Sequence, residues 1–301
     1  IFNNIIYMDY ASLNRIDKGV LRIIKKYSSK DYGNPSSIYK SGVRARDAVS
    51  DAKARIANTI HAHEDEIIFT SGGTEANQLA LNSLKGKKII ISSIEHSSII
   101  NKNNAIHIPV NNKGIVDIEV LSKSLTEDIA LVSVMAVNNE IGAIEPIHEI
   151  AKIIRDANKR MNTKILFHTD ACQAFLHLPI YVEKLAVDMI SLDGNKIYGP
   201  RGVGMLYIKR GSENNSEKII RNGTENIPAI MGFAYAIEQA EKMRIKETAR
   251  IAILKNFFLS ELIKINPEIK VNGDLKTGIA HILNISIPNT DNEFFVLQLD
   301  A

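Results

Sequence analysis

Several features that define whole classes of protein are scarce in this sequence. Its 301 residues include one cysteine, Cys172, so no disulfide can form within the chain. This fits a reducing compartment, and we predict a cytoplasmic location. The longest apolar runs, such as residues 129–137, are far shorter than the roughly 18 residues that a membrane-spanning helix needs, so no membrane association is expected.

Charge of one sign is also scarce. The 37 Lys and Arg residues nearly balance the 34 Asp and Glu residues, which leaves a net charge of +3. So small a charge over 301 residues does not indicate a nucleic acid as a partner. The 8 histidines show no ligand spacing, so the sequence predicts no metal site.

What the sequence does have is a regular alternation of strand-like and helix-like segments. Apolar runs typical of strands are followed by segments with helical spacing, such as 74–84 and 147–160. This alternation predicts an α/β fold with a mostly parallel sheet that helices cover on both faces. In such sheets, ligands bind at the carboxyl ends of the strands. The expected strands are residues 67–70, 89–92, 129–137, 164–169, 188–192 and 203–208.

The length of the chain suggests two domains of about 150 residues each. We assign residues 1–15 to an N-terminal segment that joins a small domain, 16–250 to a large cofactor-binding domain, and 251–301 to an incomplete small α+β domain. A helical stretch over 228–265, broken once, is expected to lead from the large domain to the small one.

Residues 70–75 contain two adjacent glycines between a predicted strand and a predicted helix. Free N–H groups at the start of a helix, together with the helix dipole, bind anions such as phosphate, and Thr74 adds a hydroxyl. An ordinary turn capped by Thr74 explains the same residues. On this stretch alone, both interpretations stay open.

Three further residues at strand ends could carry chemistry. Asp170 follows an apolar strand, Lys196 lies in a loop between two strands, and His96 lies just after a strand. Such a carboxylate could hold a cationic ring nitrogen, a desolvated lysine could form a Schiff base, and a histidine could stack on a flat ring. Taken one at a time, they are explained better as a helix cap, a solvated lysine and a surface histidine.

Six longer segments occur in this chain in a fixed order: GNPSS at 33–37, FTSGGTEAN at 69–77, VNNEIG at 137–142, HTDA at 168–171, KIYGPRGVG at 196–204 and RNGTEN at 221–226. Together they resemble the cysteine desulfurases, which are pyridoxal 5'-phosphate (PLP) enzymes of the aminotransferase class V. The resemblance extends from Tyr7 to the last residue. It implies a PLP-transferase type I fold and PLP as the cofactor.

The resemblance also implies a role for each matching residue. Lys196 matches the catalytic Schiff-base lysine, and Asp170 matches the carboxylate that holds the pyridinium nitrogen. His96 matches the catalytic histidine stacked on the ring, and Gln173 matches the group bonded to the ring's phenolic oxygen. The other matches are Gly73 and Thr74 to the phosphate cradle, Asn139 to an asparagine beside the cofactor and the substrate carboxylate, and Thr224 to a threonine that reaches the phosphate of a partner subunit.

Two positions of the implied cofactor site depart from the family pattern. The family has Ser-x-His before the lysine, where this chain has Asp193-Gly194-Asn195. The serine hydroxyl helps to bind phosphate, whereas a carboxylate repels it. Two like charges about 4 Å apart cost roughly 1 kcal/mol in water and roughly 4 kcal/mol at an intermediate dielectric. We therefore expect Asp193 to weaken PLP binding, to be protonated, or to point away.

The function implied by the resemblance is conversion of L-cysteine, or a similar amino acid, to L-alanine and persulfide sulfur for iron–sulfur cluster assembly. Such a transferase works as a homodimer and passes sulfur to a scaffold or acceptor protein. The family's sulfur-accepting cysteine and carboxylate-binding arginine would follow Ala301, so we expect these residues alone to turn over slowly. Two alternatives stay open: a catalytically impaired paralogue or binding protein with the PLP fold, and a related PLP lyase or aminotransferase.

Overall fold

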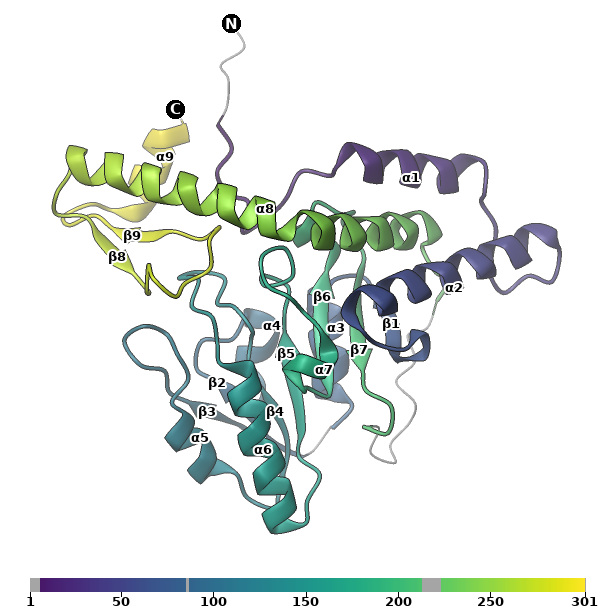
Figure 1. Ribbon diagram of the computed structural model, residues 1–301, viewed down its shortest axis with the longest axis horizontal. Coiled ribbons are helices and arrows are strands. Elements are labelled where there is room, and N and C mark those ends of the chain that lie inside the picture. Colours follow the sequence, from purple (N-terminus) through teal and green to yellow (C-terminus); the bar gives the residue numbers. More distant parts are fainter. Residues whose placement is uncertain (1–5, 85–86, 213–222, 301) are drawn as a thin grey trace, which may run out of the picture.

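The computed structural model describes residues 6–84, 87–212 and 223–300, which build one large sheet with helices around it (Figure 1). The sheet has seven strands in the order β1-β7-β6-β5-β4-β2-β3. The predicted α/β fold class is confirmed, and each expected strand is present, although the one expected over 129–137 ends at Ser133. The strands are β1 (Ile67–Thr70), β2 (Lys88–Ser92), β3 (Ala105–Ile108), β4 (Ile129–Ser133), β5 (Leu166–Asp170), β6 (Met189–Asp193) and β7 (Gly204–Ile208).

Strand direction decides which strand ends meet at one edge of the sheet. The strands from β6 to β3 pair in parallel, whereas β7 pairs antiparallel with both β6 and β1. Since two reversals cancel, β1 runs in the same direction as β6, and their carboxyl ends lie at the same edge. Across β7, Gly204 pairs with Thr70 on one side and with Asp193 on the other.

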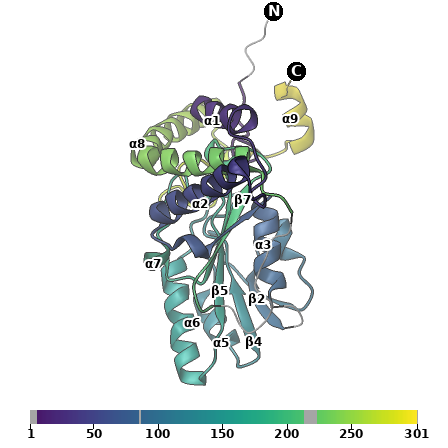
Figure 2. The ribbon, with the colours of Figure 1, turned by 90° about the vertical axis from the view of Figure 1, so that its right-hand side faces the viewer.

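Two hydrophobic cores cover the two faces of the sheet. Val132 and Phe167 belong to a core that includes residues of the helices α2 (Lys40–Ile60), α6 (Ile147–Met161) and α8 (Ile227–Ile265). Their neighbours Leu131 and Leu166 belong to a second core with residues of α3 (Gly73–Asn82). Adjacent residues of a strand point to opposite faces, so the central strands are apolar on both sides. Figure 2 shows α6 on one side of the sheet and α3 on the other.

The described helices are α1 (Lys18–Ser29), α2 (Lys40–Ile60), η1 (Glu64–Glu66), α3 (Gly73–Asn82), α4 (Ser97–Ile100), α5 (Ile118–Ser124), α6 (Ile147–Met161), α7 (Val182–Leu185), η2 (Gly194–Ile197), α8 (Ile227–Ile265) and α9 (Asn292–Asp300). Asp17 caps α1, where its Oδ1 accepts from the N–H of Gly19 at 2.6 Å. Among the described helices, α2, α3, α4 and α6 contact strands of the large sheet, and α1 and α2 pack against α8 (Figure 1).

The break predicted within residues 228–265 is wrong, because α8 is one continuous helix of 39 residues. Pro228 lies in its first turn, where a missing N–H is tolerated, and no glycine or proline follows Gly232. The rest of the helix contains five Ala, four Glu and four Lys, which have high helix propensity. Among the described helices, none has the length and apolar composition of a membrane span.

Beyond α8, a separate antiparallel pair joins β8 (Lys270–Asn272) and β9 (Asn284–Ser286), and α9 follows. These elements match the small α+β unit expected near the C-terminal end of the sequence. The boundaries proposed at residues 15 and 250 remain a prediction, and residue 250 lies within α8.

Candidate active site

The carboxyl edge of the sheet carries two aspartates on neighbouring strands. Asp170 is the last residue of β5 and Asp193 is the last residue of β6, and the two strands pair in parallel. The α3 helix begins at Gly73, just beyond β1, and therefore starts at the same edge. Lys196 follows Asp193 in the short helix η2. The topology thus gathers residues from distant parts of the sequence.

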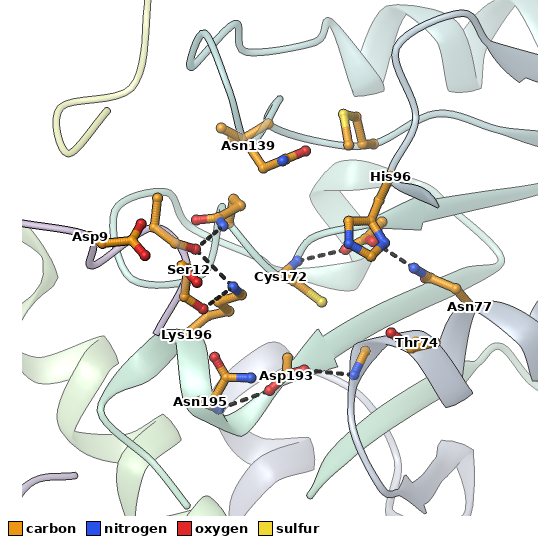
Figure 3. Close-up of a pocket in the computed structure, with 16 residues that line it drawn as sticks. Asp9, Ser12, Thr74, Asn77, His96, Asn139, Cys172, Asp193, Asn195 and Lys196 are labelled. Carbon is orange, nitrogen blue, oxygen red and sulfur yellow. Dashed lines mark hydrogen bonds between the residues drawn. The ribbon is translucent and has the colours of Figure 1, made fainter. Parts of the chain in front are cut away.

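A cavity of about 440 Å³ opens at this edge (Figure 3). Every predicted site residue lines it except Thr224, which is exposed and lies outside it. Because Thr224 is expected to act on a partner subunit, its role remains a prediction. The residues brought together are Gly73, Thr74, His96, Asn139, Asp170, Gln173, Asp193, Asn195 and Lys196.

Asp170 is buried, with 6% of its surface exposed, and its two oxygens are both paired. Asn77 Nδ2 donates to Oδ2 at 2.6 Å, and the Cys172 N–H donates to Oδ1 at 3.0 Å. Asn77 lines the cavity, and its own Oδ1 is buried without a partner among the described residues. Sequence analysis missed Asn77. Its spacing of one helical turn from Gly73 is the signal that puts both on one face of α3.

Lys196 is held by the N-terminal segment, which sequence analysis did not place in the site. Its Nζ donates to the carbonyl oxygens of Ala11 at 2.8 Å and Ser12 at 2.5 Å. Gln173 Nε2 donates to the same Ala11 oxygen at 2.8 Å, and Asn14 Nδ2 donates to the Lys196 carbonyl at 2.6 Å. Figure 3 shows Lys196 beside Ser12 and Asp9. These contacts fix the lysine loop and leave the ammonium at the cavity wall.

His96 precedes α4, and its Nδ1 accepts the backbone N–H of Ser98 at 3.2 Å. The neighbouring Glu95 is buried and accepts the N–H of Met135 at 2.8 Å. Burial raises the pKa of Glu95 to about 8, so this carboxyl is mostly protonated at neutral pH. The bond to Met135 ties the loop that carries His96 to the segment after β4.

Asp193 lies against the start of α3. The Gly73 N–H donates to its Oδ2 and the Asn195 N–H to its Oδ1, both at 2.9 Å. Of the three alternatives left open by the sequence, the one in which this side chain points away is therefore excluded. The reason is the sheet register, which sets the end of β6 opposite the end of β1 across Gly204. Figure 3 shows Asp193 between Asn195 and Thr74.

Cys172 also lines the cavity (Figure 3). Burial raises the pKa of its thiol well above the usual value, and the charges of Asp170 and Asp193 raise it further. A Cβ atom on Gly73 would lie 2.6 Å from the Cys172 Sγ, so a side chain at the start of the helix would force Cys172 to move. A protonated thiol is a poor nucleophile.

Comparison with known proteins now places this cavity in a family. The class-V aminotransferase profile matches residues 6–301. The cysteine desulfurase IscS of Dictyoglomus turgidum is 38% identical over 316 residues, which cover 98% of this chain and 79% of that protein. The chain belongs to the cysteine desulfurases. The resemblance seen in the sequence motifs is thereby confirmed.

Solved structures agree with this membership. The X-ray structure of the NifS-like protein from Rickettsia africae has a TM-score of 0.89 at 31% identity, over 99% of this chain and 85% of that one. The structure of SspA in complex with cysteine has a TM-score of 0.78 at 27% identity, over 97% of this chain and 86% of that one. The cofactor of the class-V aminotransferase and cysteine desulfurase families is PLP.

The residues of the cavity fit the ring of PLP. They offer a buried carboxylate at Asp170, an amine at Lys196, a flat imidazole at His96 and an amide at Gln173, which suit an aromatic cation with an aldehyde. The unpaired Asn77 Oδ1 leaves a buried acceptor for a bound group. Within residues 6–84, 87–212 and 223–300, no cluster of His, Cys, Asp and Glu is arranged to hold a metal ion. At the phosphate end, Gly73 and Thr74 offer donors that Asp193 already faces.

Proposed function

We propose that this protein is a PLP-dependent cysteine desulfurase. In the reaction, L-cysteine and a thiol R–SH give L-alanine and the persulfide R–S–SH. The observation that carries the proposal is the convergence of Lys196, Asp170, His96 and Gln173 on one cavity, in a chain that is 38% identical to an IscS. The complex of the similar protein SspA with cysteine supports the same substrate.

The chain's own residues supply binding and proton transfer. When bound, PLP supplies an electron sink for negative charge that develops on the substrate. Asp170 is positioned to hold a proton on the ring nitrogen, since Asn77 and the Cys172 N–H fix the orientation of its carboxylate. Lys196 Nζ moves protons to and from the substrate once it leaves the Ala11 and Ser12 carbonyls. Gln173 would hold the phenolic oxygen of the ring and His96 would cover its face, as the family resemblance implies.

The sulfur acceptor R–SH is, in our proposal, a thiol other than Cys172. The Cys172 thiol is held protonated by burial and by Asp170 and Asp193, so little thiolate is available to attack the substrate sulfur. A Cys172→Ala variant should therefore form alanine at the same rate as the wild type when dithiothreitol serves as the acceptor.

We further infer a cytoplasmic homodimer in which Thr224 contacts the cofactor phosphate of the partner subunit, and which delivers sulfur to an iron–sulfur scaffold or another acceptor. The exposure of Thr224 outside the cavity supports such a role. Sedimentation at micromolar concentration tests the dimer, and a monomer would contradict it. The alternatives of a lyase, an aminotransferase or an inactive paralogue are not favoured, because IscS proteins match over nearly the whole chain.

The decisive experiment compares wild type with Lys196→Ala and with a control variant, Lys159→Ala. Purified protein with added PLP should develop the visible absorption band of a lysine-bound cofactor, and addition of L-cysteine should change the band and release alanine. Lys196→Ala should lose both signals, whereas Lys159→Ala, at an exposed position on α6, should keep them. A band that survives in Lys196→Ala would show that another group binds the cofactor.

A further inference from the structure

The start of α3 already has an anionic partner within the chain. The α3 helix has ten residues and begins at Gly73, and glycine at the capping position, Gly72, has no side chain with which to cap it. The Asp193 carboxylate performs this task from the end of β6, since its Oδ2 accepts the Gly73 N–H at 2.9 Å. A carboxylate is favoured there because the helix dipole is positive at this end.

The carboxylate also fills the space beside both glycines. A Cβ atom built on Gly72 would come 3.2 Å from Asp193 Oδ2, and one built on Gly73 would come 3.5 Å from the same oxygen. The second oxygen is held by the Asn195 N–H at 2.9 Å. An anion that uses the Gly73 N–H must therefore displace Asp193 Oδ2 or approach it closely.

The sheet holds Asp193 in this position. Gly204 on β7 pairs with Asp193 on one side and with Thr70 on the other, so a single residue separates the two strand ends. A side chain at position 204 is excluded, because its Cβ would lie 2.5 Å from the Leu192 carbonyl and 2.8 Å from the Gly72 backbone. The close approach of β6 to the Gly72–Gly73 turn is thus built into the register.

The charges that line the cavity do not neutralise a phosphate placed beside the Asp193 carboxylate. Asp9, Asp170 and Asp193 line it, and among the described lining residues Lys196 carries the ammonium. That ammonium is engaged by the carbonyl oxygens of Ala11 and Ser12. The phosphate group of PLP carries up to two negative charges, and the helix start with Gly73 and Thr74 is the donor site that suits it.

We propose that Asp193 is a specificity-determining residue of the cofactor site, whose carboxylate competes with the phosphate of PLP for the Gly73 N–H. The inference rests on the proposed function in taking PLP as the cofactor. Its consequence is selective: the wild-type carboxylate weakens binding of PLP, and leaves pyridoxal, which has the same ring and aldehyde without the phosphate, unaffected.

The test measures dissociation constants of PLP and of pyridoxal for the full chain, stripped of cofactor, by titration of absorbance and intrinsic fluorescence. Asp193→Asn removes the charge and keeps one acceptor oxygen for one of the two N–H groups, those of Gly73 and Asn195, and Asp193→Ser supplies a hydroxyl. The control is Asp156→Asn, at an exposed carboxylate on α6. The thermal unfolding midpoint of each variant establishes that it is folded.

Asp193→Asn should bind PLP about tenfold more tightly, within the roughly 5- to 1,000-fold range of repulsion between charges about 4 Å apart. Its affinity for pyridoxal should change by less than about twofold, and Asp156→Asn should change neither. An equal gain for both ligands, or an unchanged PLP constant in a folded Asp193→Asn, would overturn the proposal while the proposed function stands. Absence of PLP binding in wild type and every variant would overturn both.

Discussion

Asp170 and Asp193 end neighbouring parallel strands, yet they meet opposite demands. Asp170 is buried, accepts hydrogen bonds from Asn77 and Cys172, and faces the part of the cavity suited to a cationic ring. Asp193 accepts bonds from Gly73 and Asn195, and occupies the donors suited to an anionic phosphate. The same type of side chain therefore favours binding of the cofactor ring at position 170 and opposes binding of its phosphate at position 193.

The difference teaches that the effect of a carboxylate on cofactor binding depends more on the charge of the group it faces than on its own hydrogen bonds. Both aspartates accept a hydrogen bond on each oxygen, at 2.6 and 3.0 Å for Asp170 and at 2.9 Å twice for Asp193. Bonding of this quality makes each carboxylate a fixed charge. A fixed negative charge stabilises a pyridinium and destabilises a phosphate.

The largest expected effect is on catalysis, and it comes from removing the charge of Asp170, which faces the ring of the cofactor. Asp170→Asn keeps an acceptor for one of the two donors and removes the charge that holds a proton on the ring nitrogen. We expect alanine formation to fall by about a hundredfold or more, because the cofactor becomes a weaker electron sink. Rates from single-turnover assays with saturating PLP are the measurement. A fall of less than about threefold would mean that the charge of Asp170 is not used.

Much of this site could be predicted from sequence because its parts are local. The lysine and the turn after it lie within residues 196–204, and Asp170 and Gln173 lie within one short segment. The alternation of strands and helices then sets these segments at one edge of a parallel sheet. The sequence therefore predicts both which residues line the site and at which edge of the sheet they lie.

What sequence could not supply are contacts between distant backbone groups. The carbonyls of Ala11 and Ser12 that bind Lys196 carry no side-chain signal and lie about 185 residues away in the chain. The orientation of Asp193 depends on the register of β7. This strand lies between β6 and β1, and its residue Gly204 pairs with Asp193 on one side and with Thr70 on the other. The strand β3 was also missed, since AIHI at 105–108 follows a polar stretch and is only four residues long.

Glu145 is a third carboxylate to compare with the two aspartates. It is buried like Asp170, but only one of its two oxygens accepts a hydrogen bond. Its Oε2 accepts the Val116 N–H at 3.0 Å, and its Oε1 has no partner among the described residues. Burial raises the pKa of Glu145 to about 7. The unfolded chain loses this proton near pH 4.5 and the folded chain near pH 7, so Glu145 lowers stability as pH rises through this window.

Glu145→Gln should remove that loss. Between pH 5 and pH 8, the free energy of unfolding of the variant should rise relative to wild type by an amount on the order of 2 kcal/mol. Urea denaturation at both pH values measures the difference, with the exposed Glu149→Gln as the matched control. Parallel pH profiles for wild type and Glu145→Gln would show that the Glu145 carboxyl ionises freely in the folded protein.

Removing the Asp193 side chain should destabilise the protein without cofactor more than the protein with cofactor bound. Without PLP, Asp193→Ala leaves the N–H groups of Gly73 and Asn195 without their acceptor, and the free energy of unfolding should fall by about 1 kcal/mol. With saturating PLP the deficit should shrink or reverse, since binding of a ligand stabilises the folded state. Urea denaturation with and without PLP measures both; an equal deficit in the two states would mean that Asp193 acts only as a cap.

The smallest expected effect is on the reactivity of the Cys172 thiol, on which the two aspartates act in the same direction. The charges of Asp170 and Asp193 both raise the pKa of the Cys172 thiol, beyond the larger effect of burial. Alkylation by iodoacetamide at pH 8 reports the thiolate fraction, because the thiolate is the reactive form. Wild-type protein should react far more slowly folded than in urea. Asp170→Asn and Asp193→Asn should each speed the folded-state reaction by about two- to fivefold, whereas Asp156→Asn should not. If only one of the two accelerates it, the carboxylate without effect is screened from the thiol, and the two ends of the cavity differ in solvation as well as in the charge they face.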